Sequence, residues 1–233
     1  MTRLAFLDFD RTLFAEDSFM WVLSDDPFRQ ERIRSVMASK KLNETHTEYT
    51  RRFLRKMGVL RGLSTKVITN KCDTEELPFS PDAHLLVSGL QEMGFRVIVL
   101  SGGIEEVVKK AQEALGFDAY FATQCLQYEN GEYLTGEVVG SCITRDSKGD
   151  MVRQLCAAAG CSLRDCVAVG DGINDISMFR LVGFSVAFGK NCEERVQDEA
   201  TTCVSSNCLQ GVIEKIKEWN REQPRQWEEK RNY

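Results

Sequence analysis

Two aspartates end the first apolar stretch of the chain. Asp8 and Asp10 follow residues 4–7, and Thr12 comes two positions later. Residues i and i+2 of a strand point to the same face, so the two carboxylates leave the strand as neighbours. Two like charges about 4 Å apart repel by roughly 4 kcal/mol at an effective dielectric constant of about 20, so a cation or a shared proton must lie between them. The alternative is that one carboxylate caps the next helix while the other is solvated.

Two further polar features have residue types that suit anion binding. Ser101, Gly102 and Gly103 follow the apolar run of residues 95–100, and a serine with main-chain amides at the start of a helix can bind an anion such as phosphate. Lys148 falls in the first turn of a predicted helix, where the helix dipole disfavours a cation. This placement suggests that the lysine serves another purpose, although an exposed lysine is the alternative.

A second acidic group follows the apolar residues 166–169. It contains Asp171, Asn174 and Asp175, and together with Asp8 it carries more negative charge than one lysine neutralises. Hard carboxylate oxygens without His or Cys select Mg²⁺ over zinc. Four polar clusters are thus present: residues 8–12, residues 101–103, Lys148 and residues 171–175. Together they predict an in-line phosphoryl-transfer site, in which a carboxylate attacks phosphorus because no Cys, His or Ser of the set has a base beside it.

The elements that must position these residues alternate between strands and helices. This alternation predicts an α/β fold with a doubly wound, Rossmann-like and mostly parallel sheet. In such sheets the ligand crevice lies at the carboxyl ends of the strands, where all four clusters fall. The predicted strands cover residues 4–7, 95–100, 120–121, 166–169, 184–188 and 201–204, and the predicted helices between and after them cover residues 81–93, 104–115, 146–159 and 209–219.

Two insertions interrupt the alternation. A helical block over residues 28–70 predicts a small cap, so the predicted division is a core of residues 1–14 and 76–233 and a cap of residues 15–75. A β-hairpin is predicted around Asn130-Gly131, the residues that a type I′ turn requires.

Charge is distributed unevenly. Residues 29–71 hold twelve Lys and Arg against three Glu, although the whole chain has a net charge of -5. A basic cap beside an acidic core suggests an anionic ligand between them, and a solvated helical face is the alternative. The acidic total and the lack of a recognisable binding motif disfavour nucleic acid as a partner.

Cysteine and histidine usage indicates the compartment. Nine cysteines form no C-x-x-C pair and mostly lie in apolar contexts, as reduced thiols acting as small hydrophobic residues would, which predicts a cytoplasmic protein. His46 and His84 lie far apart with no Cys or His at ligand spacing, so a zinc site is not expected. No signal-peptide core or membrane-spanning stretch is predicted.

The four clusters occur in the order of the four motifs of the haloacid dehalogenase superfamily, which the chain resembles. The motifs are Asp-Phe-Asp-Arg-Thr at residues 8–12, Ser-Gly-Gly at residues 101–103, Lys148, and Gly-Asp-Gly-Ile-Asn-Asp at residues 170–175. The run over residues 167–179 is similar to the phosphoserine phosphatase branch in particular, and the helical insertion is similar to the small cap of that branch. The resemblance implies an Mg²⁺-dependent phosphatase of a small phosphorylated metabolite.

The resemblance also implies a role for each motif residue. Asp8 would attack phosphorus and become an aspartyl phosphate, while Asp10 would protonate the leaving oxygen and then deprotonate the attacking water. The Mg²⁺ ligands would be the Asp8 carboxylate, the main-chain carbonyl of Asp10 and Asp171, with Asp175 orienting them. The remaining substrate and phosphate contacts implied are Thr12, Ser101, Gly102, Lys148 and Asn174.

The match is looser in the cap. The resemblance implies an acidic residue that holds the substrate amino group and an arginine that holds its carboxylate, for which Asp17 and Arg51 are the candidates. An aromatic residue expected to close over the substrate has no counterpart near residues 43–45, and Arg11 stands where the family usually has a small residue.

The resemblance to the phosphoserine phosphatase branch makes phosphoserine the leading candidate substrate. The alternatives are another small phosphomonoester such as a phosphorylated amino alcohol or sugar, a phosphotransferase that passes the phosphoryl group to an alcohol, or a regulator that binds a phosphometabolite without turnover.

Overall fold

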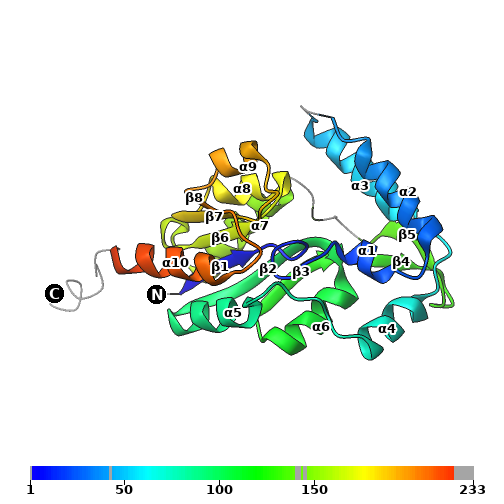
Figure 1. Ribbon diagram of the computed structural model, residues 1–233, viewed down its shortest axis with the longest axis horizontal. Coiled ribbons are helices and arrows are strands. Elements are labelled where there is room, and N and C mark those ends of the chain that lie inside the picture. The colour runs from blue at the N-terminus through cyan, green and yellow to red at the C-terminus, as the bar shows by residue number, and fades with distance from the viewer. Residues whose placement is uncertain (1, 42–43, 140–142, 144–145, 223–233) are drawn as a thin grey trace.

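A six-stranded sheet forms the centre of the computed structural model, which describes residues 2–41, 44–139, 143 and 146–222 (Figure 1). The strand order is β3-β2-β1-β6-β7-β8, and every neighbouring pair is parallel. This arrangement confirms the predicted doubly wound α/β fold. The strands are β1 (Arg3–Leu7), β2 (Phe95–Ile104), β3 (Ala119–Thr123), β6 (Val167–Gly170), β7 (Phe184–Phe188) and β8 (Thr202–Val204).

The chain reverses its direction across the sheet between β1 and β6. From β1 it runs outward through β2 to β3, then returns to place β6 on the other side of β1. Such a switch point opens a crevice at the carboxyl ends of the two strands. The fold therefore brings the residues that follow β1 and β6 to one place.

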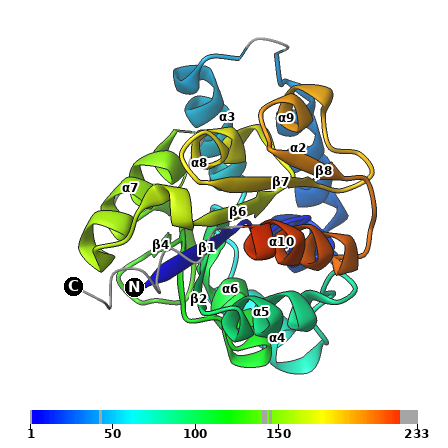
Figure 2. The same cartoon turned by 90° about the vertical axis from the view of Figure 1, so that its left-hand side faces the viewer.

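Helices cover both faces of the sheet (Figure 2). Alternate residues of β1 pack into two separate apolar cores, with Ala5 and Leu7 on one face and Leu4 and Phe6 on the other. This alternation is what a strand buried on both faces requires. The helices on the Ala5 face are α5 (Ala83–Glu92), α6 (Glu105–Leu115) and α10 (Gln210–Glu222), and those on the Leu4 face are α7 (Ser147–Ala159), α8 (Ile176–Phe179) and α9 (Glu194–Asp198).

The helical insertion and the hairpin pack together beyond the carboxyl ends of the strands (Figure 1). Leu134 in the hairpin accepts a 2.8 Å hydrogen bond from the Gly62 amide and donates one of 2.9 Å to the Leu63 carbonyl. The predicted boundaries at residues 15 and 75 stay a prediction. The elements are α1 (Ser18–Val22), α2 (Pro27–Ala38), α3 (His46–Gly58) and α4 (Thr65–Thr74), with hairpin strands β4 (Cys125–Gln127) and β5 (Leu134–Val138).

Two local predictions are wrong. The hairpin turn is not type I′, because Gly131 has φ 68° whereas Asn130 is not among the described residues with positive φ. The Asn130 side chain instead accepts a 3.1 Å hydrogen bond from the Glu132 amide, an Asx-type turn that competes with the left-handed conformation. Helix α5 begins at Ala83 rather than directly after Ser80, because Asp82 adopts a left-handed conformation with φ 66°.

None of the described helices is long and apolar enough to cross a membrane.

Candidate active site

Asp8 lies at the switch point of the sheet. Its main-chain amide donates a 2.9 Å hydrogen bond to the Val169 carbonyl, which continues the pairing of β1 with β6 by one residue. The residue is buried, with 3% of its surface exposed. Asp8 therefore occupies the crevice that the sheet topology creates.

Lys148 fixes one oxygen of Asp8 from beneath. Its ammonium lies 2.5 Å from Oδ1 of Asp8 and 2.6 Å from Oδ1 of Asp175. Helix α7 approaches closely enough for this because Gly149 has no side chain, since a Cβ there would lie 2.9 Å from the Ser177 carbonyl oxygen. Burial alone would lower the pKa of Lys148, but the charges of Asp175 and Asp8 outweigh burial and raise it. Lys148 is thus a permanent cation in the floor of the site.

A third carboxylate, that of Asp171, lies beside the two that bind Lys148. Oxygens of Asp8, Asp171 and Asp175 all lie within 4.8 Å of one another. Burial, followed by the charges of its two acidic neighbours, raises the pKa of Asp171 well above its usual range. The Gly172 amide holds Oδ2 of Asp175 at 2.9 Å. The excess negative charge and the all-oxygen donor set fit Mg²⁺.

Asp10 is held by a single residue of the next helix. The Ser18 amide donates to Oδ1 of Asp10 at 2.8 Å, and the Ser18 hydroxyl donates to Oδ2 at 3.2 Å. Burial raises the pKa of Asp10 to about 7, and the charges of Asp17 and Asp8 act in the same direction. A carboxyl group with this pKa can hold and release a proton near neutral pH.

The predicted phosphate-binding turn is packed against Asp10. Ser101 is fully buried, and its hydroxyl accepts a 2.8 Å hydrogen bond from the Gly103 amide. A Cβ on Gly103 would lie 2.7 Å from the Ser18 hydroxyl and 3.0 Å from Oδ2 of Asp10, so only glycine fits there. Gly102 lines a cavity next to Asp8 and Asp10, whereas Ser101 and Thr12 do not. The Thr12 hydroxyl is buried without a hydrogen-bond partner among the described residues.

A cavity of about 140 Å³ opens between this floor and the helical insertion. On the core side its lining includes Asp8, Asp10, Asp171 and Asn174. The cavity thus brings four of the predicted carboxylates together, those of Asp8, Asp10, Asp17 and Asp171, and its size suits a small substrate.

Helix α3 forms the opposite wall. Tyr49, Arg52, Phe53 and Lys56 line the cavity, and their spacing of three and four residues places them on one helical face. The predicted substrate contact Arg51 is exposed and is not part of this lining, because it falls outside that face. The basic side chains of α3 that line the cavity are those of Arg52 and Lys56.

The cavity wall also contains aromatic side chains, although the sequence offered no counterpart near residues 43–45 for the aromatic residue that the resemblance implies. Tyr49 and Phe53 lie further along the chain than residues 43–45, and an added Cβ on Gly102 would lie 3.4 Å from the Phe53 ring. Arg52 itself is ion-paired with Glu44 through hydrogen bonds of 2.8 and 2.7 Å.

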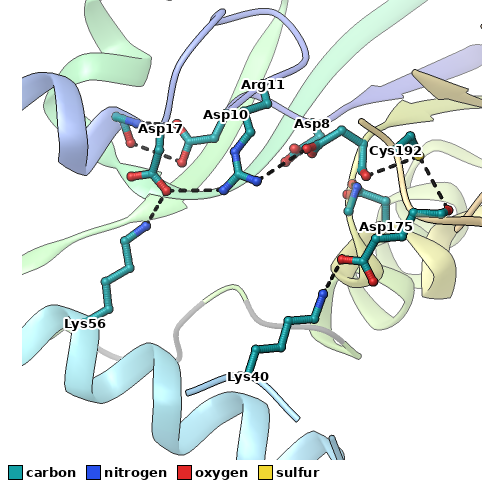
Figure 3. A network of polar contacts seen from close by, with 12 residues as sticks. Asp8, Asp10, Arg11, Asp17, Lys40, Lys56, Asp175 and Cys192 are labelled. Carbon is teal, nitrogen blue, oxygen red and sulfur yellow. Dashed lines mark hydrogen bonds and ion pairs between the residues drawn. The ribbon is translucent and has the colours of Figure 1, made fainter. Parts of the chain in front are cut away.

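Asp17, the predicted contact for an amino group, already has two cationic neighbours (Figure 3). The Lys56 ammonium lies 2.7 Å from its Oδ2, and the Arg11 guanidinium lies 3.6 Å away. Burial opposes ionisation, but the charge and hydrogen bond of Lys56 outweigh it and lower the pKa of Asp17. Arg11 also reaches Asp171 at 3.9 Å, so its side chain spans the cavity entrance between the two acidic residues.

No sequence pattern points directly to Ser18, to Lys56 or to the position of Arg11 at the cavity. The spacing of residues 49, 52, 53 and 56 was the available signal for the cavity-facing side of α3. The local pattern does not show which face of a helix meets another part of the fold.

The family comparison agrees with this geometry. The model of the haloacid dehalogenase-like hydrolase family matches residues 5–180. The chain belongs to the haloacid dehalogenase-like hydrolase family. The predicted superfamily is thereby confirmed, and the similarity to phosphoserine phosphatases confirms the prediction of a phosphatase-type hydrolase.

Several relatives carry the same name. The chain is 31% identical to a phosphoserine phosphatase of Streptomyces coelicolor over 91% of its own length and 49% of that protein, so it spans about half of that relative. It is 27% identical to the phosphoserine phosphatase of Methanocaldococcus jannaschii over 92% of its own length and 98% of that protein. A phosphoserine phosphatase of Wolinella succinogenes is 33% identical over 80% of this chain and 87% of its own length.

Solved structures show the same fold. A phospho-aspartyl intermediate analogue of a phosphoserine phosphatase superposes with a TM-score of 0.78 at 25% identity, over 92% of this chain and 98% of that one. A substrate-bound phosphoserine phosphatase complex superposes with a TM-score of 0.80 at 24% identity over the same shares of the two chains.

Proposed function

We propose that the chain hydrolyses a small phosphomonoester in two steps, with Asp8 as nucleophile, Asp10 as proton donor and acceptor, and phosphoserine as the first candidate substrate. The observation that carries this proposal is the position of Asp8 at the floor of a small cavity, fixed by Lys148 and next to a carboxyl group with a pKa of about 7. We also propose a cytoplasmic location, because the eight described cysteines are all free thiols.

In the first step the Asp8 carboxylate attacks phosphorus. Lys148 holds Oδ1, and Oδ2 accepts no hydrogen bond from the described residues, so Oδ2 is the attacking atom. Asp10 enters this step protonated and donates its proton to the oxygen of the departing alcohol. The products are a phosphorylated Asp8 and the free alcohol.

In the second step water releases the phosphate. Asp10 is now ionised, takes a proton from the attacking water and returns to its starting state. Ser18 keeps the Asp10 carboxyl in place through both steps, because it binds both of its oxygens. The same residue thus acts first as acid and then as base.

Mg²⁺ fits the carboxylates of Asp8, Asp171 and Asp175, with the Asp10 main-chain carbonyl as a further proposed ligand, and when bound it would neutralise charge on the transferred phosphoryl group. Lys148 and the Gly102 main chain are proposed to hold the phosphate oxygens. Ser101 and Thr12 would support this part of the site from behind the cavity wall.

A second candidate substrate follows from the pairing of Asp17. Since Lys56 and Arg11 already neutralise its charge, Asp17 is less available to a substrate ammonium group. The same two cations would attract an anionic group on the substrate. A small phosphomonoester that carries a carboxylate but no amine is therefore the alternative to phosphoserine.

The test is release of phosphate from an aryl phosphate and then from a panel of small phosphomonoesters in the presence of Mg²⁺. We expect turnover that EDTA and Asp8→Asn both abolish. The control Arg180→Ser, which removes an exposed ion pair with Glu199, should leave turnover unchanged. Phosphate release by Asp8→Asn at the rate of the parent chain would exclude the mechanism. Tight binding of phosphometabolites without turnover would instead support a regulator.

Addition of glycerol to the same assay distinguishes hydrolysis from phosphotransfer. Hydrolysis predicts equal amounts of alcohol product and inorganic phosphate. A shortfall of inorganic phosphate matched by a new phosphorylated alcohol would identify a phosphotransferase.

A further inference from the structure

Three cysteines meet at the amino end of β6, at the opposite end of this strand from Asp171. Cys156 is in the last turns of α7, Cys161 is in the loop after this helix, and Cys166 directly precedes β6. The sulfur of Cys166 lies 3.6 Å from that of Cys156 and 3.9 Å from that of Cys161. All three sulfurs lie within 4.8 Å of one another.

The helix end explains how residues with C-x₄-C-x₄-C spacing come together. Gly160 adopts a left-handed conformation with φ 62° and ends α7. The chain turns back at this point, and the Cys161 amide donates a 3.0 Å hydrogen bond to the Cys156 carbonyl. The turn thus brings together three of the cysteines that the sequence places in apolar surroundings.

The distances suit a metal ion better than a disulfide. Sulfur ligands at about 2.3 Å from a zinc ion lie about 3.8 to 4.0 Å apart in tetrahedral or trigonal geometry. A disulfide requires a sulfur–sulfur distance of about 2.0 Å. The observed 3.6 and 3.9 Å therefore need only small side-chain adjustments to surround an ion.

The cluster has a route of entry from solvent. Cys156 and Cys166 are buried, while Cys161 is half-buried and connects the cluster with solvent. Arg3 lies close enough for its positive charge to interact with Cys166, which would offset the negative charge of a divalent ion bound by three thiolates.

We infer that Cys156, Cys161 and Cys166 form a binding site for one thiophilic d¹⁰ metal ion of the Zn²⁺ and Cd²⁺ type, separate from the carboxylate site. Each thiol that binds releases its proton to solvent, and no electron transfer is involved. Three sulfur ligands select such ions over Mg²⁺, which prefers oxygen. The site joins α7 to β6, whose other ends carry Lys148 and Asp171.

The test is titration of the full chain with Cd²⁺ under a phosphine reductant and excess Mg²⁺. The ultraviolet sulfur-to-cadmium charge-transfer band reports thiolate binding alone, so neither the carboxylate site nor enzymatic activity affects the readout. We expect the band to saturate at one equivalent in the parent chain and affinity to fall at least about tenfold in Cys161→Ser, since loss of a ligand costs at least as much as loss of a supporting contact. Cys203→Ser, which alters an exposed cysteine on β8, should bind as the parent chain does. No band in the parent chain, or equal affinity in Cys161→Ser, would overturn the site.

A second measurement needs no variant. Zn²⁺ should slow alkylation of Cys161 by iodoacetamide, measured by peptide mapping, and leave alkylation of Cys203 unchanged. Equal rates at Cys161 with and without Zn²⁺ would contradict metal binding at this cluster.

Discussion

The ammonium of Lys148 lies 2.5 Å from Oδ1 of Asp8, and the two side chains are 0% and 5% exposed. A cation buried this completely persists because two carboxylates accept its hydrogen bonds. The contact aligns Asp8 and also compensates part of the charge that Asp171 adds to the same site. Catalysis and stability are therefore expected to depend on the same lysine.

Lys148→Met should lower both activity and stability. Methionine retains most of the volume but leaves Asp8 and Asp175 buried without their cation, which should lower the free energy of unfolding by about 3 kcal/mol in EDTA. Urea denaturation measures this change, and excess Mg²⁺ should reduce it because the ion replaces part of the missing charge. An unfolding free energy equal to that of the parent chain would show that the lysine is not needed for charge compensation.

Asp10→Asn should separate the two chemical steps. With an alkyl phosphate we expect turnover to fall about 100-fold or more, since the leaving oxygen receives no proton. An aryl phosphate needs no such proton, so its first turnover should stay fast and appear as a burst of the phenol before a slow steady state. Rapid-mixing kinetics measures the burst. Equal losses in burst rate and steady-state rate for both substrates would exclude Asp10 as the proton donor.

Arg11→Ser should change substrate preference without affecting the fold. The Arg11 side chain is 54% exposed and its nearest acidic groups are Asp17 and Asp171. Its removal should make Asp17 more available to an ammonium group, so the ratio of kcat/KM for phosphoserine to that for an amine-free analogue with a carboxylate should rise. The matched control is Arg180→Ser, which removes an arginine of similar exposure from another ion pair. A ratio that does not change would exclude a role for Arg11 in specificity.

Lys56→Ala and Arg51→Ala form a matched pair on α3. Lys56 lines the cavity, so its removal should raise KM by about tenfold or more if it binds a charged substrate group. Arg51 is exposed outside the cavity, so its removal should leave KM unchanged. Steady-state kinetics at saturating Mg²⁺ tests both. The reverse outcome would restore Arg51 as the substrate contact and contradict the position of the cavity wall.

Mg²⁺ should stabilise the chain as well as activate it. Because Asp8, Asp171 and Asp175 repel one another, binding of the ion should raise the melting temperature measured in EDTA. Asp171→Asn should raise the melting temperature in EDTA, since it removes one of the repelling charges, and should reduce the further increase on adding Mg²⁺. Calorimetry in EDTA and in Mg²⁺ measures both effects. An Mg²⁺-induced increase of the same size in Asp171→Asn would place the ion elsewhere.

Local sequence patterns were enough to predict the sheet and the acidic floor of the site. Apolar runs that end in Asp8 and before Asp171 predict parallel strands, and the carboxyl ends of parallel strands must lie along one edge. The position of Lys148 in the first turn of α7 was also evident, because capping residues and apolar spacing mark the start of that helix. These inferences depend on local periodicity and on one general rule of sheet topology.

Which side chains face one another across the cavity depends instead on the three-dimensional packing of the elements. The rotation and placement of one element against another set three contacts. They place Lys56 rather than Arg51 in the cavity wall, Ser18 against Asp10, and Cys156 beside Cys166. Local sequence fixes the period of a helix but not its rotation relative to a distant strand, because that rotation is set by long-range packing between side chains far apart in the chain.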